Sequence, residues 1–339
     1  MTINRSPFRV VLFTVTLLLV AAGFAPAQEK EKKKGQDEKV EGLTSVSVNI
    51  PTVTLNLTVT DKDGNLVTGL TREYFKVYED GQPQEITNFF RDDSAVSVVL
   101  LMESSRLISG IEQDFYYAVM DFIRNLRKDD YCALVTFDIK PRIAVDFTQD
   151  KGKIANEANI SLYFQGFSES ALSDAVVFVL DRMKEVKGKK AVVLLSTGLD
   201  TFSRMTYSKA LGIAGESDTV LYAISMGQLV RMLNEDAYSS VTRSEFLMAD
   251  LRLKSFAKRT GGFALFPRFS SEYPAVFRNV NLYLRFQYTL AYQPSNQKLD
   301  GKTRKIKVEA MADVDHDGKP DVLKVACKDS YKPGQEEKD

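Results

Sequence analysis

The chain has 339 residues, of which 44% are hydrophobic and 27% charged, enough for one large domain or two ordinary ones. Lys and Arg together number 45, as do Asp and Glu, so no basic excess favours nucleic-acid binding. A single histidine, His316, and two cysteines, Cys132 and Cys327, exclude a multi-histidine metal site, a zinc cage and a disulfide framework.

Residues 1–27 have the pattern of a signal peptide. Arg5 and Arg9 precede an apolar stretch that ends at Ala25-Pro26-Ala27, a small-x-small cleavage pattern. The apolar stretch is shorter than the ~20 residues of a membrane span, which favours cleavage over an uncleaved anchor. Residues 28–45 form a charged tether with little to bury. The sequence therefore predicts export to the periplasm or the cell exterior, with no transmembrane span after cleavage.

Residues 46–92 show a strand pattern. Apolar and polar residues alternate from Val53 to Val59, which predicts a half-buried strand. A turn is predicted at Asp61–Asn65, and further strands at Phe75–Tyr78 and Gln84–Phe89. This β segment is too small to be stable alone.

Residues 93–282 alternate between strand and helix patterns. Strands are predicted at Val96–Met102, Tyr131–Phe137, Ile143–Phe147, Ala191–Leu195, Val220–Ile224 and Phe263–Phe266, and helices at Ile111–Leu126, Leu172–Met183 and Phe246–Ala257. This order predicts an α/β fold with a doubly wound, mostly parallel sheet and helices on both faces. Residues 228–245 form a long excursion, interpreted as a partner-contact loop or a variable surface loop.

The strand pattern returns in residues 283–331. Leu284, Phe286, Tyr288 and Leu290 alternate with polar neighbours, and shorter strands are predicted at 305–309 and 323–326. We expect this segment to pair with residues 46–92 into a small β-sandwich, with the α/β domain inserted between them. Two independent β appendages are the alternative. Residues 332–339 form a charged tail.

Several landmarks resemble a family of secreted bacterial proteins related to the von Willebrand factor A (VWA) domain. They are Leu57–Gly64, Gly69–Thr71, Val77–Gln84, Thr260–Gly262 and Gln287–Pro294, so the resemblance covers about residues 50–295. It implies a VWA fold. It also implies a place for Mg²⁺ or Mn²⁺ at the carboxyl edge of the sheet, held by an Asp-x-Ser-x-Ser motif, a Thr and a second Asp.

This sequence departs from the implied metal motif. Aligned with it, Met102, Ser104 and Arg106 occupy the Asp and the two Ser positions, Ser170 the Thr position and Thr197 the second Asp position. Both carboxylates are then missing. A register shifted by one residue would use Glu103 and Ser105, with Leu107 in the last place, and would restore one acid.

We therefore expect a degenerate site without Mg²⁺ or Mn²⁺, because a thioether is a poor ligand for these ions and a guanidinium repels them. Arg106 is predicted to lie near the vacated metal position, held by Glu103 or Asp200; the alternative is that it points into water. The predicted binding surface consists of Met102, Glu103, Ser104, Arg106, Ser170, Thr197 and Asp200.

A second candidate site is an aspartate-rich loop near the C-terminus. Its spacing resembles the opening of a calcium loop, and Gly318 permits the sharp turn. The candidate calcium residues are Asp313, Asp315, Asp317, Lys319 and Asp321. Against calcium, Lys324 stands where a bidentate Glu is usual, and the flanks look like strands. A polar hairpin turn is the alternative.

The sequence predicts an exported, non-enzymatic protein that binds another protein or an envelope component through its VWA-like domain. The alternatives are metal-dependent adhesion, through a variant VWA site or the 313–321 loop, and more remotely a hydrolase that uses paired carboxylates. Whether Cys132 and Cys327 pair stays open: Cys132 is predicted in a buried strand, and a disulfide would need the C-terminal segment to reach it.

Overall fold

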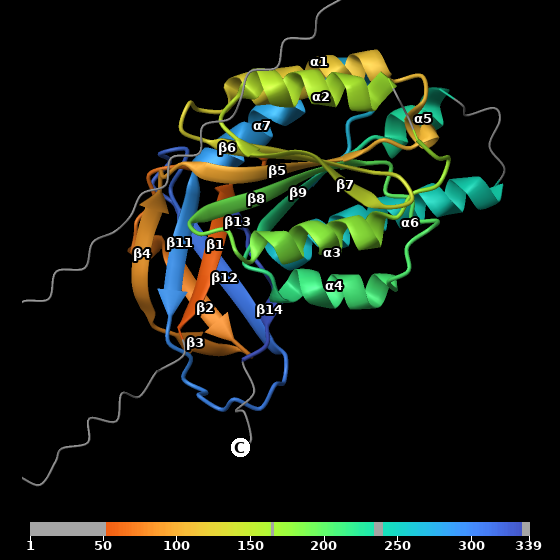
Figure 1. The fold of residues 1–339 in the computed structure, drawn as a ribbon. Coiled ribbons are helices and arrows are strands. Elements are labelled where there is room, and N and C mark those ends of the chain that lie inside the picture. Colours follow the sequence, from red (N-terminus) through yellow and green to blue (C-terminus); the bar gives the residue numbers. More distant parts are fainter. Residues whose placement is uncertain (1–51, 164–165, 234–239, 334–339) are drawn as a thin grey trace, which may run out of the picture. The chain divides into compact units, whose positions relative to one another are not determined.

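The computed structural model describes residues 52–163, 166–233 and 240–333. Within them the chain is a mixed α/β protein, which confirms the fold class in outline (Figure 1). The predicted signal peptide and tether, the start of the first β segment and most of the C-terminal tail lie outside these ranges and stay predictions. No helix in the described ranges combines the length and the apolar character needed to cross a membrane.

The α/β part is built on a six-stranded sheet in the order β10-β9-β8-β5-β6-β7. Its strands are β5 (Val96–Glu103), β6 (Tyr131–Phe137), β7 (Pro141–Thr148), β8 (Lys189–Ser196), β9 (Val220–Ser225) and β10 (Ala264–Leu265). Strand β7 is antiparallel to β6, and the remaining neighbours are parallel. Along the chain the strands proceed outward from β5 in one direction and then from β8 in the other, so the order reverses between these two strands.

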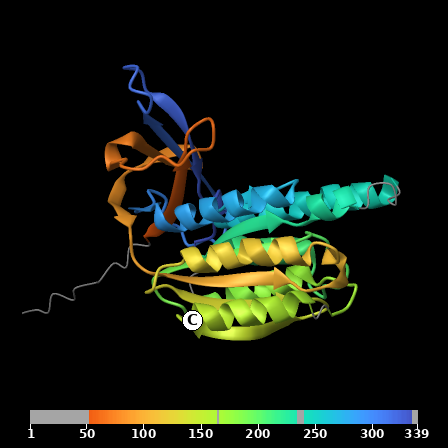
Figure 2. The ribbon, with the colours of Figure 1, turned by 90° about the horizontal axis from the view of Figure 1, so that it is seen from above.

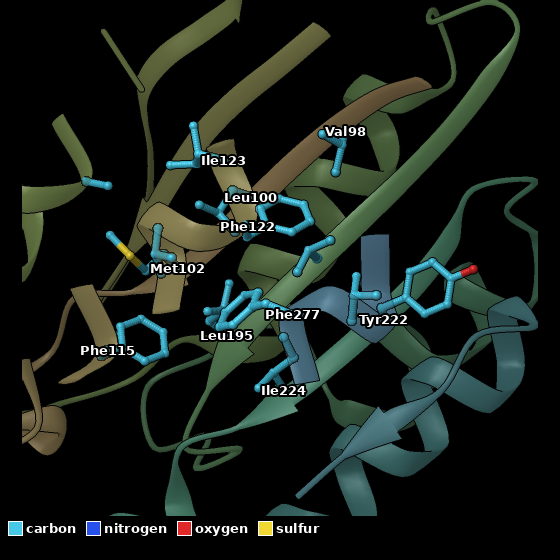
Figure 3. Packing of buried hydrophobic residues seen from close by; sticks show 14 of the residues in the cluster. Val98, Leu100, Met102, Phe115, Phe122, Ile123, Leu195, Tyr222, Ile224 and Phe277 are labelled. Atoms are coloured by element: carbon cyan, nitrogen blue, oxygen red, sulfur yellow. The ribbon is translucent and has the colours of Figure 1, made fainter. Parts of the chain in front are cut away.

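Helices cover both faces of this sheet, so its central strands are apolar on both sides (Figures 1 and 2). One face carries α1 (Glu112–Asn125), α2 (Lys151–Tyr163) and α7 (Tyr273–Arg285); the other carries α3 (Leu172–Met183), α4 (Tyr207–Glu216) and α6 (Ser240–Thr260). In the core of the first face, Phe122 of α1 and Phe277 of α7 meet at 5.7 Å between ring centroids, beside Leu100 of β5 (Figure 3).

Several helices depart from the predicted pattern. Helices α2, α4 and α7 were not predicted, and the supposed excursion at 228–245 contains α5 (Gly227–Leu233) and the start of α6. Leu284 lies in the last turn of α7, so its assignment to a strand is wrong. Tyr273, Phe277, Val280 and Leu284 are buried at helical spacing on one face of α7. The alternating pattern of β11 follows directly, so the sequence pattern placed the change from helix to strand too early.

The remaining strands form a second sheet in the order β3-β2-β12-β13-β1-β11-β4, with β14 paired to β12. They are β1 (Val53–Thr60), β2 (Phe75–Glu79), β3 (Gln82–Gln84), β4 (Ile86–Asp92), β11 (Gln287–Tyr292), β12 (Arg304–Ala312), β13 (Asp321–Ala326) and β14 (Ser330–Tyr331). Strand β1 pairs antiparallel with both β11 and β13, so β strands from before and after the α/β part interleave in one sheet. Phe75 of β2 and Phe89 of β4 lie 5.0 Å apart by ring centroid, so this sheet folds over its own core.

Candidate functional site

The carboxyl ends of β5, β6, β8 and β9 meet at one edge of the α/β sheet. Because the strands are parallel, the residues that follow them gather at this edge from distant parts of the sequence. Buried polar residues are concentrated there: Glu103, Ser104, Ser105, Asp138, Ser170, Ser196, Thr197 and Ser225.

Glu103 is the centre of this polar edge. Its side chain is fully buried, and no cation pairs with it among the described residues. One carboxylate oxygen accepts from Ser105 Oγ at 2.7 Å; the other accepts from Ser196 Oγ at 2.7 Å and the Thr197 amide at 2.8 Å. Thr197 Oγ1 lies 3.0 and 3.2 Å from the two oxygens. Burial raises the pKa of Glu103, and these hydrogen bonds oppose the rise.

The structure corrects the alignment that put Met102 and Ser104 at metal-ligand positions. Met102 is fully buried in the apolar core beneath α1 (Figure 3), and Ser104 Oγ donates to the Phe137 carbonyl at 3.3 Å. Glu103 and Ser105 lie together at the polar edge instead. Side chains alternate between the faces of a strand, so a shift of one residue exchanges the core set for the edge set. The two polar residues of the shifted register, Glu103 and Ser105, are the ones that bond to each other at the edge.

The expectation that Glu103 or Asp200 holds Arg106 is also wrong. Arg106 is exposed, begins a short 3-10 turn (Arg106–Ile108), and its side chain has no ion pair within the part of the chain that the structure describes. Its backbone amide donates to the Phe167 carbonyl at 3.0 Å. Asp200 instead accepts from Ser173 Oγ and Ser203 Oγ, both at 2.5 Å. Glu103 and Asp200 are thus hydrogen-bonded to hydroxyl groups, and the Arg106 side chain is exposed to solvent.

Ser170 and Thr197 both lie at the edge, as predicted. The Ser170 carbonyl accepts from the amides of Thr201 and Phe202 at 2.8 and 2.9 Å, which holds the loop after β8 against the loop before α3. Ser170 Oγ is buried and has no hydrogen-bond partner in the described residues.

A second buried acid, Asp138, was missed from the sequence. It follows β6 directly and accepts from Arg142 at 3.2 Å. Gly166 approaches so closely that a β-carbon there would overlap this carboxylate. The available signal was its position, since an acid immediately after a buried strand falls at the carboxyl edge.

Mg²⁺ and Mn²⁺ favour several oxygen ligands including carboxylates. Both carboxylate oxygens of Glu103 already accept hydrogen bonds from hydroxyl or amide groups. Asp138 and Asp200 are engaged by Arg142 and by serine hydroxyls. The unpartnered Ser170 Oγ is a neutral ligand that does not make up for the missing acid.

Two aromatic side chains flank the polar edge, and the sequence reading did not single them out. Phe167 precedes α3 and is 58% exposed; Phe202 follows β8 and is 50% exposed. The hydrogen bonds from Arg106 to Phe167 and from Phe202 to Ser170 fix both loops beside Glu103. We call Arg106, Phe167 and Phe202 the rim. Exposed aromatic and arginine side chains in fixed loops are typical of protein-binding surfaces.

The aspartate-rich loop connects β12 to β13 in the second sheet. Oxygens of Asp313, Asp315 and Asp317 lie within 4.8 Å of one another, and all three residues are exposed. The Asp313 carboxylate accepts from the amides of Asp317 and Gly318, at 3.1 and 3.0 Å. The flanks are strands, as the sequence predicted, so this is a hairpin loop rather than a helix-flanked calcium motif. Lys319 lies in the same loop, and its amide donates to Asp317, whereas Asp321 is the first residue of β13.

Both cysteines are free. Cys132 lies in β6 at the centre of the α/β core, whereas Cys327 follows β13 in the other sheet. Burial raises the pKa of each thiol to about 12. Neither is therefore a nucleophile at neutral pH.

No protein-family model and no curated protein matches this chain. Similar solved structures include an aerotolerance-related membrane protein from Bacteroides fragilis, 12% identical, covering 56% of this chain and 98% of that one with a TM-score of 0.43. The vWF domain of the type V pili tip protein Mfa5 from Porphyromonas gingivalis is 11% identical, over 57% and 97% of the two chains, with a TM-score of 0.42. A von Willebrand factor type A structure from Catenulispora acidiphila is 10% identical, over 86% and 76%, with a TM-score of 0.45.

At these identities the likeness says nothing about function. The six-stranded, mostly parallel sheet with helices on both faces is the arrangement that the VWA resemblance of the sequence landmarks implies.

Proposed function

We propose that this protein is an exported, non-enzymatic adhesion or scaffold module that binds another protein or an envelope component at the carboxyl edge of its VWA-like sheet. The second sheet, which we propose to be a small β-sandwich, presents this domain. The rim of Arg106, Phe167 and Phe202 makes the contact, around a closed polar centre at Glu103.

The observation that supports this proposal is that Arg106, Phe167 and Phe202 are all exposed at this edge and that the Arg106 guanidinium has no ion pair among the described residues. Phenyl rings left in water bury apolar area when a partner covers them. Arg106 is free to meet an acidic group on that partner, because Glu103 and Asp200 are satisfied by hydroxyls. The partner surface should therefore combine apolar and acidic groups.

We further propose that binding at this edge is independent of Mg²⁺ and Mn²⁺. In domains that use such an ion, acidic side chains hold it; here the available acid is enclosed by four donor groups. Arg106 places an exposed positive charge at this edge. A chelator should therefore leave partner binding unchanged.

The same enclosure argues against a hydrolase. Paired-carboxylate catalysis requires two acids that reach a substrate. Glu103 and Asp138 are both buried and hydrogen-bonded to protein groups.

Site-specific photo-crosslinking tests the contact surface directly. A photoreactive phenylalanine analogue replaces Phe202 in the full chain, expressed in its own cells and irradiated. We expect one discrete adduct whose partner peptide is identified by mass spectrometry. Phe90 is the matched control, since it is 52% exposed on β4 of the other sheet. Equal adducts at Phe90 and Phe202 would contradict the proposal.

The captured partner then permits a quantitative test. Arg106→Ala and Phe202→Ala should each weaken its binding by about tenfold or more, because a truncated central contact costs about 1–2 kcal/mol or more. Phe90→Ala should leave the affinity unchanged. Binding that is lost in EDTA would contradict the metal-free part of the proposal and leave the rim to be judged by the substitutions alone.

A second candidate function is calcium binding by the β12–β13 loop. The convergence of Asp313, Asp315 and Asp317 oxygens favours it. We propose that the loop takes one Ca²⁺ weakly, with a dissociation constant of about 10⁻⁴–10⁻³ M, the range of extracellular modules with few fixed ligands.

Calorimetric titration with Ca²⁺ after removal of bound ions tests this candidate. We expect saturable binding that disappears in Asp315→Ala/Asp317→Ala. Asp300→Ala is the control, because Asp300 is likewise exposed and accepts from the amide two residues later. No heat with the native chain, or equal binding by the double variant, would refute the site.

A further inference from the structure

A small pocket away from the rim is lined by several cations and, among the described residues, by no acid. It has a volume of about 220 Å³ and lies in the second sheet, between the start of β1, the loop after β11 and strand β14. Four positively charged side chains line it: Lys298, Arg304, Lys328 and Lys332. Thr52, Thr54, Asn296 and Gln297 add hydroxyl and amide groups.

Arg304 fixes the shape of this pocket. It is 3% exposed and pairs with the buried Glu79 at 3.2 Å. The hydroxyls of Tyr292 and Tyr331 each donate to the same Glu79 carboxylate at 2.8 Å. The guanidinium also donates to the carbonyls of Asn296 and Lys298, which ties the loop after β11 to the wall of the pocket. The pocket is therefore built on a buried network rather than on mobile surface groups.

Lys328 supplies a charge that has no direct ion pair among the described residues. It is half-buried and has no ion pair or hydrogen bond from its side chain within the described residues. Its backbone packs tightly against Gly261, at the end of α6, so the main chain at Lys328 is held in place. Burial lowers the pKa of Lys328, with Asp218 acting in the opposite direction. A half-buried ammonium without a partner is costly, and an anion would relieve that cost.

We propose that this pocket binds one small oxyanion, a phosphate or carboxylate group, with Lys328 as its main contact. Lys298 would reinforce the attraction from the loop after β11, because it is exposed and its ammonium has no ion pair in the described ranges. Lys332 contributes less, because it pairs with Glu216 at 3.6 Å. The site lies on other elements than the rim, so it does not depend on the proposed function.

Isothermal titration of the purified protein at constant ionic strength tests the proposal. Inorganic phosphate and acetate are titrated separately against a chloride background, which distinguishes a phosphate group from a carboxylate. We expect saturable binding of one of the two. Lys328→Met keeps the aliphatic stem and should weaken that binding by about tenfold or more, the equivalent of losing a charge-assisted hydrogen bond.

Lys324→Met is the matched control. Lys324 lies in β13, four residues before Lys328, is exposed, and donates a hydrogen bond to the Lys62 carbonyl. This variant should bind the anion as the native chain does. If Lys328→Met does not fold, Lys298→Met and Thr54→Val replace it, because both positions are exposed. Absence of saturable binding for both anions, or equal loss in Lys324→Met, would overturn the proposal.

Discussion

At the scale of single residues, Glu103 has the most unusual environment in the described structure: a fully buried acid with no cation beside it. Its hydrogen bonds come from hydroxyls and an amide, which stabilise the ionised form without a full opposing charge. Burial outweighs them and raises the pKa. Glu103 therefore gives the folded protein a defined dependence on pH.

The first prediction concerns Glu103→Gln. Below about pH 4.3 the carboxyl is protonated in both states. Above that pH the unfolded chain loses the proton first, so the contribution of Glu103 to stability declines as the pH rises through the raised folded pKa. Each unit of elevation corresponds to about 1.4 kcal/mol. Glutamine fits the site, because its carbonyl can accept from the Thr197 amide while its NH₂ group donates to Ser105.

Urea unfolding at pH 4.5 and pH 8 measures this effect. The native chain should lose more stability between the two pH values than Glu103→Gln does. Glu85→Gln is the control, because the Glu85 side chain is 89% exposed. If the stability of the native chain and of Glu103→Gln depended on pH in the same way, the pKa of Glu103 would not be raised in the folded protein.

At the scale of elements, the loop after β8 is held against α6 at Gly198. This glycine has φ +79°, and a β-carbon there would lie 2.6 Å from the Ala249 carbonyl. The close packing of Gly198 against Ala249 of α6 fixes the loop that carries Thr197 and Asp200. A side chain at 198 would push the polar edge and α6 apart.

The second prediction compares Gly198→Ala with Gly64→Ala. Gly64 has φ +90° but open space around it, so its substitution carries backbone strain alone, about 1–2 kcal/mol. Gly198→Ala adds overlap with backbone atoms, and we expect it to cost about 1–3 kcal/mol more. Thermal or urea unfolding measures both. Equal costs would mean that the loop and α6 separate freely.

At the scale of the whole molecule, the chain passes between the two sheets twice, before Val96 and after Arg285. Asp130 lies at both crossings. Its carboxylate accepts from the Val96 amide at 3.0 Å and from Arg285 at 2.9 Å, and from the Arg127 amide at 2.6 Å. Burial alone would raise the pKa of Asp130, but these hydrogen bonds hold it below its ordinary value. One buried ion pair thus fixes the entry to and the exit from the α/β domain.

The third prediction concerns Asp130→Ala. Removing this acid leaves the Arg285 guanidinium buried without its partner, which typically costs about 3–5 kcal/mol. Asp93→Ala removes an exposed partner of Arg91 instead and should change stability little. Urea unfolding compares the two. Adding Arg285→Met to Asp130→Ala should recover part of the loss, and a double variant no more stable than Asp130→Ala would argue against the pairing.

Much of the strand pattern could be predicted from local sequence. Strand β5 was predicted from the continuous apolar run Val96–Met102, and strand β1 from the strict alternation of Val53–Val59. Both patterns are typical of strands. Helix α2 was missed because its buried residues, Ile154, Ala155, Ala158 and Leu162, include small side chains that give a weak pattern. The start of β11 was misplaced because the helical spacing of α7 runs into it without a break.

The candidate site was predicted less completely. Ser170 and Thr197 lie at the polar edge, whereas Met102 lies in the apolar core and Ser104 Oγ bonds to the Phe137 carbonyl. The sequence left two registers of the motif open, because neither register contains both of the usual acids. Asp138 was missed although it directly follows a predicted strand, and Phe202 has no sequence pattern that marks it. Their roles arise from the loops that fold beside them.

The sequence by itself determined the alternation of strands and helices, the polar residues that follow the strands Val96–Met102 and Ala191–Leu195, and the spacing of the aspartates at 313–321. These are properties of neighbouring residues, and local periodicity carries them. Only the tertiary structure decided that Glu103 rather than Met102 faces the edge, that Arg106 is exposed, and that Arg304 and Lys328 line one pocket. Each of these depends on contacts between residues far apart in the chain, which burial and hydrogen bonding select once the sheets have formed.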